Sequence, residues 1–174
     1  MKRLYLILTF FVIWILEMMF LPAVSFIAPI ALFLAGITTL NILLDYRRAL
    51  YYSLWFGLLT DAVIGRSLGV TALSWLSASL VVYLIIKNIV SNRERFSKLG
   101  LYTLALVVNY LVLIGSLLLL EKLNLNVIPL EFSGLNLLDI LISIIVSLLA
   151  FPLIYKTTKK VYEFVNKKEA TIHI

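Results

Sequence analysis

Apolar residues along the chain gather in six long runs that are separated by short polar gaps. The runs cover residues 4–21, 24–44, 49–64, 68–90, 99–120 and 136–155. A helix needs about 20 predominantly apolar residues to cross a bilayer, and most of these runs are that long. None of them alternates polar and apolar residues as a membrane β-barrel strand does. The pattern predicts an all-α integral membrane protein, with six transmembrane helices in a single polytopic domain over residues 1–174.

Basic residues are distributed unequally between the two sets of polar gaps. One set, together with the chain ends, carries 13 of the 15 lysines and arginines, and the other set carries Arg66 and Lys122. Because short basic loops stay in the cytoplasm, we expect both termini to be cytoplasmic, with a basic tail over residues 156–174. The first run resembles a signal peptide, but it is long and five more runs follow it, so we expect it to remain as a helix.

The composition agrees with a lipid environment, since 63% of the residues are hydrophobic and 14% are charged. Soluble proteins have about a quarter charged residues. The chain has no cysteine, and His173 is its single histidine. This excludes disulfides and thiolate chemistry and argues against zinc sites and histidine acid–base catalysis. No catalytic set and no phosphate-binding glycine loop is present, so we expect no cofactor, no metal and no enzyme activity.

The third run and the turn after it carry small and polar residues in the stretch WFGLLTDAVIGRSLGVTALSW. Gly57, Asp61 and Gly65 are spaced by four and share one helix face. Gly69 and Ala72 continue this pattern of small residues into the fourth run. Small residues at such spacing let helices approach closely in lipid, so we expect a tightly packed helical hairpin with GRSLG as its turn.

Asp61 lies inside an apolar stretch, where an isolated charge is unfavourable. One interpretation is an ion pair with Arg66, the basic residue of the same turn, and Glu17 in the first run is a second candidate partner. The other interpretation places Asp61 at the membrane surface, where it touches water and helps the turn to close. The sequence leaves both interpretations open.

Three further features fall outside this hairpin. Asn109 lies near the middle of the fifth run, where we expect it to hydrogen-bond a neighbouring helix. The loop over residues 121–135 is apolar enough to lie on the membrane or on a partner. In the basic tail, Val161, Phe164 and Val165 have helical spacing among lysines, which indicates either a helix end at anionic lipid or a partner-binding helix.

The stretch FGLLTDAVIGRSLGVTAL resembles the central motif of the MreD family, the rod shape-determining membrane proteins of bacteria. That family shows Gly-Leu-Leu-x-Asp, then a glycine, then Leu-Gly-x-x-Ala-Leu. The matching residues here are Gly57, Leu58, Leu59, Asp61, Gly65, Leu68, Gly69, Ala72 and Leu73. The residue-level match covers about a tenth of the chain, while the length and the six runs agree over the whole of it. With Arg66, these residues form a candidate helix-packing or partner motif.

The resemblance implies a non-enzymatic scaffold subunit of the complex that elongates rod-shaped cells, located in the bacterial cytoplasmic membrane. The implied partners are an MreC-like protein, a RodA-like glycosyltransferase with its transpeptidase, the MreB filament and membrane lipids. The family's fold resembles the substrate-binding subunit of energy-coupling-factor vitamin transporters. Small-molecule binding is therefore the alternative function, although few polar side chains lie within the runs to line a pocket: Glu17, Asp61, Asn109 and Asp139.

Overall fold

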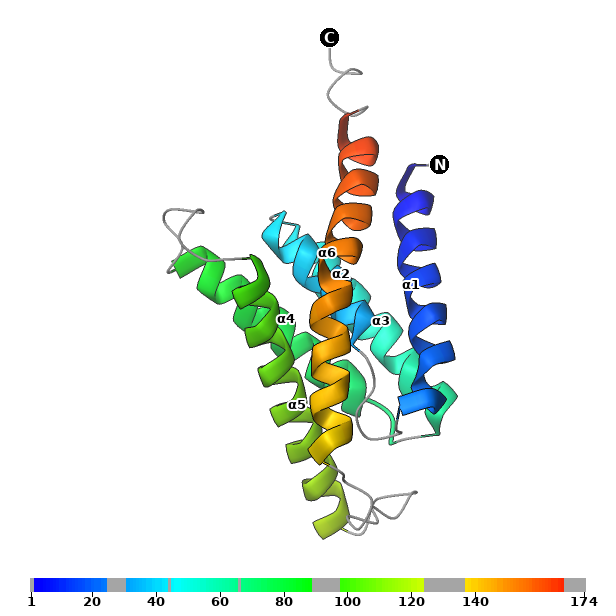
Figure 1. The fold of residues 1–174 in the computed structure, drawn as a ribbon, viewed down its shortest axis with the longest axis vertical. Coiled ribbons are helices and arrows are strands. Elements are labelled where there is room, and N and C mark those ends of the chain that lie inside the picture. Colours follow the sequence, from blue (N-terminus) through cyan, green and yellow to red (C-terminus); the bar gives the residue numbers. More distant parts are fainter. Residues whose placement is uncertain are drawn as a thin grey trace.

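The computed structural model describes residues 2–24, 31–43, 45–65, 67–88, 98–123 and 137–167, and these residues form helices and turns with no strand. The helices are α1 (Lys2–Val24), α2 (Leu32–Ile42), α3 (Tyr46–Ile64), α4 (Val70–Asn88), α5 (Lys98–Lys122) and α6 (Leu137–Lys167). The start of α1 and the end of α6 lie at the same end of the molecule (Figure 1). The predicted all-α class is confirmed for the described residues.

Three of the described helices are long and apolar enough to cross a membrane. They are α4, the part of α5 over Lys98–Leu120 and the part of α6 over Ile142–Val165. Shorter apolar helical stretches cover Leu4–Met19 and Leu32–Ile42. These segments mark the chain as a membrane protein, while the expectation of six spans stays a prediction.

The second apolar run does not form one long helix in the described residues. Helix α2 has 11 residues and is therefore about 16 Å long, roughly half the thickness of a bilayer core. Residues 25–30 of the predicted run lie outside the described part. Every residue from Ala31 to Asn41 is buried, and α2 contacts each of the other five helices. The run is apolar because α2 is enclosed by protein on all sides, as expected for a helix that is hydrophobic all round.

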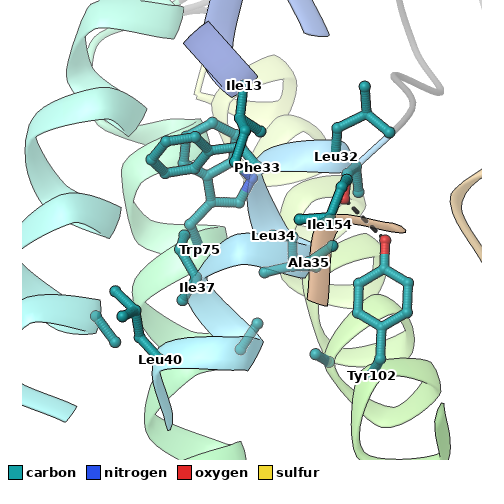
Figure 2. Close-up of a cluster of buried hydrophobic side chains, with 14 of the residues drawn as sticks. Ile13, Leu32, Phe33, Leu34, Ala35, Ile37, Leu40, Trp75, Tyr102 and Ile154 are labelled. Carbon is teal, nitrogen blue, oxygen red and sulfur yellow. Dashed lines mark hydrogen bonds between the residues drawn. The ribbon is translucent and has the colours of Figure 1, made fainter. Parts of the chain in front are cut away.

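Aromatic side chains hold α1, α3 and α4 against this central helix. Phe33 of α2 stacks on Trp75 of α4 with 4.7 Å between ring centroids, and Figure 2 shows both rings within the buried cluster. Phe33 also meets Phe56 of α3 at 4.8 Å and Phe10 of α1 at 5.4 Å. Aromatic pairs at such distances contribute beyond the area that they bury, so Phe33 joins four helices at one point.

Helix α6 continues well past the predicted end of the sixth span at residue 155. It runs for 31 residues with Pro152 in its interior, and its last turns lie beside the beginning of α1 (Figure 1). Thr158 and Val165 are buried, and Phe164 packs edge-to-face on Tyr5 of α1. The helix continues because these contacts give the tail a packed face. Residues 168–174 and the apolar loop over 124–136 lie outside the described part.

Helices α3 and α4 approach each other most closely at Gly57. A Cβ atom built on Gly57 would lie 2.4 Å from Cα and 2.7 Å from the backbone nitrogen of Ala72. Gly65 behaves differently, because no described residue lies within 4 Å of its Cβ position and its φ of 74° is left-handed. Gly69 is similar, with a φ of 102°. The predicted packing role of Gly65 is therefore wrong, and both glycines supply the turn conformation instead.

This contrast predicts opposite effects of alanine at two helical glycines. Gly57→Ala should lower the free energy of unfolding by about 1–3 kcal/mol, because the new methyl group overlaps backbone atoms that cannot rotate away. Gly115→Ala on α5 places the new methyl group more than 4 Å from any described residue outside its own helix and should be neutral or slightly stabilising. Thermal unfolding of both variants in the same detergent measures the difference. Equal stability of the two variants would contradict the close packing at Gly57.

Candidate functional site: two carboxylates at helix N-termini

Asp61 lies in the last turn of α3, and its carboxylate reaches the beginning of α4. Oδ2 accepts a hydrogen bond from the backbone N–H of Gly69 at 2.8 Å. The N–H of Thr71 lies 3.1 Å from both carboxylate oxygens. Asp61 is fully buried, and α4 begins at Val70, so this carboxylate caps the N-terminus of the next helix.

The cap supplies hydrogen-bond acceptors to backbone N–H groups that would otherwise have none. The first N–H groups of any helix have no carbonyl partner within the helix, and water is absent from a bilayer core. The residue before α4 is Gly69, which has no side chain to act as a local cap. A carboxylate from α3 supplies the acceptors and also meets the positive end of the α4 dipole. The carbonyl of Asp61 in turn accepts the N–H of Gly65, which ends α3. We call residues 57–72 the capped hairpin.

The structure decides between the two interpretations of Asp61 in part. Its turn-closing role is present, but the expected contact with water is wrong because the side chain is 0% exposed. Arg66 lies outside the described residues, so the expected ion pair stays a prediction. Glu17, the second candidate partner of Asp61, instead accepts a hydrogen bond at the beginning of α2.

Glu17 of α1 repeats the same arrangement at the central helix. Its Oε2 accepts a hydrogen bond from the backbone N–H of Phe33 at 2.6 Å, in the first turn of α2, and the side chain is 2% exposed. On the other side of that helix start, Ser147 Oγ accepts from the N–H of Ala31 at 3.0 Å. The hydroxyl of Tyr102 donates to the carbonyl of Ala31 at 2.8 Å, drawn as a dashed line in Figure 2. Helices α1, α5 and α6 thus all hold the beginning of α2.

The interhelical hydrogen bonds of the described residues were difficult to identify from the sequence. Asn109 is buried on α5 as expected, but its side-chain oxygen has no hydrogen-bond partner in the described part. Asn41 instead links α2 to α4, with its Nδ2 donating to Ser79 Oγ at 2.9 Å. Trp14 Nε1 donates to Thr60 Oγ1 at 2.8 Å and links α1 to α3. Polar residues inside apolar runs were the available signal, but serine and threonine can also bond within their own helix.

The remaining motif residues divide by exposure. Gly57, Asp61 and Ala72 are buried within the capped hairpin. Leu58 is half-buried, whereas Leu59 is 45% and Leu68 is 75% exposed. The motif therefore combines a buried set that fixes the hairpin with leucines that are partly or largely exposed.

The described residues contain no group of three or more histidine, cysteine, aspartate or glutamate side chains that could hold a metal ion. Both carboxylates accept hydrogen bonds from backbone amides, and the structure assigns them to separate helix starts. The side chain of Asp139, the last of the candidate pocket residues, lies outside the described part. Over the described residues this arrangement defines an all-helical membrane protein in which buried carboxyl groups cap the beginnings of two helices. No family model, no curated protein and no solved structure matches the chain.

The capping role predicts a graded response at position 61. Asp61→Leu leaves the N–H groups of Gly69 and Thr71 buried without acceptors and should lower the free energy of unfolding by about 1–3 kcal/mol. Asp61→Asn keeps one acceptor oxygen and should fall between Asp61→Leu and the unchanged protein. Thermal unfolding in detergent measures the series.

The matched control is Asp45→Asn, which makes the same change at the start of α3. Asp45 is half-buried, and its contact with the N–H of Arg48 is long at 3.4 Å. This control should therefore change stability by less than Asp61→Asn does. Equal losses at the two positions would contradict the special role of the buried cap.

A separate prediction concerns Glu17 and the first turn of α2. Glu17→Leu removes the acceptor of the Phe33 N–H, so hydrogen exchange in the α2 peptide should become faster while exchange in α5 stays unchanged. Glu17→Gln retains an acceptor oxygen and should keep most of the protection. Mass spectrometry of deuterium uptake in detergent gives both readings. Unchanged protection in the Glu17→Leu variant would show that this carboxylate does not hold the start of α2.

Proposed function

We propose that the chain is a MreD-family scaffold subunit of the bacterial rod complex, a non-enzymatic protein that spans the cytoplasmic membrane six times. The observation that carries this proposal is the structural role of the motif residues. Its buried members, Gly57, Asp61 and Ala72, hold two helices and their turn in one fixed arrangement. A motif whose polar residue bonds backbone amides supports a rigid binding surface rather than a reaction.

The outer side of the capped hairpin supplies a surface for a partner. Four apolar side chains are exposed there: Leu59 and Val63 on α3, Leu68 in the turn and Leu73 on α4. Helices in lipid associate through packing of such surfaces. An MreC-like protein with a single membrane span has the one helix that this surface needs. In this proposal the RodA-like glycosyltransferase, its transpeptidase and the MreB filament join through the same assembly.

The distribution of charge supports the proposed orientation. Both termini are cytoplasmic in this proposal, which is supported by the 13 basic residues at one set of gaps and at the chain ends. Helices α1 and α6 run side by side in opposite directions, so the start of α1 and the end of α6 reach the same end of the molecule (Figure 1). A chain that spans the membrane six times, an even number, also has both of its ends on the same side.

One observation favours a second candidate, the substrate-binding subunit of a vitamin transporter. Glu17, Tyr102 and Ser147 converge inside the helical bundle at the start of α2. Transporters bind anionic substrates at the N-termini of interrupted helices within the membrane. Here the N–H groups of Ala31 and Phe33 already have partners from the chain itself, which favours the scaffold.

The scaffold proposal predicts that the exposed leucines of the capped hairpin hold the MreC-like partner. The double variant Leu59→Ala/Leu68→Ala should reduce co-purification of that partner at least about fivefold, because the partner helix loses packing contacts. The control Leu118→Ala/Leu119→Ala changes two exposed leucines of α5 and should leave recovery unchanged. Quantitative mass spectrometry after gentle detergent extraction at native expression measures both.

The same cells separate the two candidate functions. Depletion of the protein from a rod-shaped host should produce rounded cells with disturbed lateral wall synthesis. Normal cell shape combined with lost uptake of a vitamin, or with a small molecule retained by the purified protein, would move the function to the transporter class.

A further inference from the structure

A hollow of about 610 Å³ lies between the beginnings of α1 and α3. Its lining combines two arginines and an aspartate with tyrosines and aliphatic side chains: Leu6, Ile7, Asp45, Arg47, Arg48, Tyr51 and Tyr52. It lies at the basic end of the molecule, because α1 begins with Lys2 about one turn before Leu6 and Arg47 lies in the first turn of α3. The capped hairpin turn is at the opposite end of α3, so this hollow is separate from the proposed partner surface.

The charges of the hollow are only partly balanced. Arg48 forms an ion pair with Asp45 at 3.0 Å, and both side chains are partly exposed. Arg47 is exposed, and its Nε donates to the hydroxyl of Tyr46 at 3.3 Å. Among the described residues Arg47 has no carboxylate partner. Two arginines against one aspartate leave the lining with a net charge of +1, which matches a ligand with one negative charge.

Two exposed apolar rows run from this hollow along the helices. On α3, Tyr51 and Trp55 are spaced by four and are 59% and 52% exposed. On α1, Ile7 is followed at the same spacing by Phe11 and Ile15, which are 46%, 44% and 39% exposed in that order. Residues spaced by four form a continuous row along one helix face. A phosphate in the hollow would therefore have hydrocarbon-binding surface directly beside it, in the direction of the membrane interior.

We propose that this hollow binds the phosphate of a singly charged phosphodiester lipid, with the acyl chains lying along the two rows. Arg47 donates directly to the phosphate oxygens, since its guanidinium has no carboxylate to satisfy it. Arg48 is oriented toward the hollow by Asp45. Tyr51 adds a hydroxyl donor at the rim, and its ring begins the α3 row. The proposed ligand has both a head group and chains because the hollow and the rows together present both kinds of surface.

The test uses the full-length protein in detergent with phosphatidylglycerol, phosphatidylcholine and inorganic phosphate as probes, and native mass spectrometry as the readout. Phosphatidylglycerol should bind in preference to phosphatidylcholine. Arg47→Gln should weaken phosphatidylglycerol binding about fivefold and Arg47→Gln/Arg48→Gln about 25-fold, since each basic side chain at an anionic membrane surface contributes about that factor. Lys159→Gln/Lys160→Gln removes the same charge from α6 and should change affinity by less than about twofold, because its lysines lie outside the hollow.

A second readout follows the acyl chains. Phosphatidylglycerol with brominated chains should quench Trp55 in a Trp14→Phe/Trp75→Phe background more strongly than brominated phosphatidylcholine at the same mole fraction. Arg47→Gln should remove that difference, and because Arg47 is exposed this variant tests the site even if the double variant does not fold. Three results would overturn the proposal: equal binding of both lipids, an equal effect of the α6 control, or displacement of the lipid by millimolar inorganic phosphate without Trp55 quenching, which would indicate a free phosphate site.

Discussion

Backbone N–H groups at the beginning of a helix need acceptors, and inside a helical bundle in lipid these have to come from the protein. The rest of this structure depends on how that need is met. Among the helix starts that the structure describes, two are buried, and in each case a carboxyl group from another helix supplies the acceptor: Asp61 for α4 and Glu17 for α2. The same bonds remove the disadvantage of placing an aspartate and a glutamate among apolar side chains. Each buried carboxyl group and each helix start is stable because the other is present.

The short central helix α2 is the main structural consequence of capping buried helix starts in this way. An 11-residue helix with all sides buried can exist only if its neighbours enclose it and satisfy its first turn. Phe33 connects it to α1, α3 and α4 through aromatic contacts, while Tyr102 and Ser147 hold its start from α5 and α6. The outer helices are then arranged around α2 and expose their own apolar faces outward. The buried contacts of α2 and the exposed apolar side chains of the outer helices therefore result from the same arrangement of helices.

The long apolar runs predicted the helical class and most helix positions, because such a run has few alternatives in a membrane. Apolar composition does not fix the length of a helix, however. An enclosed short helix and a spanning helix are equally apolar, so the sequence does not predict that α2 covers only Leu32–Ile42 of the second run. The predicted span ends at residue 155, but the helical spacing of Val161, Phe164 and Val165 indicates a helical tail, and α6 does continue to Lys167, with Thr158 and Val165 buried. Turn glycines and packing glycines also look alike in sequence, which is why Gly65 was grouped with Gly57.

The candidate site was found in the sequence, but its bonding was not. Asp61 was identified because a charge in an apolar run needs an explanation, and side chains were the partners that the sequence displayed. The observed partners are main-chain groups of Gly69 and Thr71, which every residue type except proline carries. Glu17 was missed as a cap because its partner, Phe33, is an apolar residue with nothing in its side chain to attract a charge.

Because Asp61 bonds to main-chain amides, its hydrogen bonds depend on the path of the backbone and not on which side chains its neighbours carry. Gly65 and Gly69 fix the path of the turn, and Asp61 fixes its closure, while the exposed side chain of Leu68 does not take part in those bonds. Evolution is then free to vary an exposed side chain of the turn without loosening the fold. A protein built in this way can acquire a new binding specificity on an exposed turn while the scaffold beneath it stays the same.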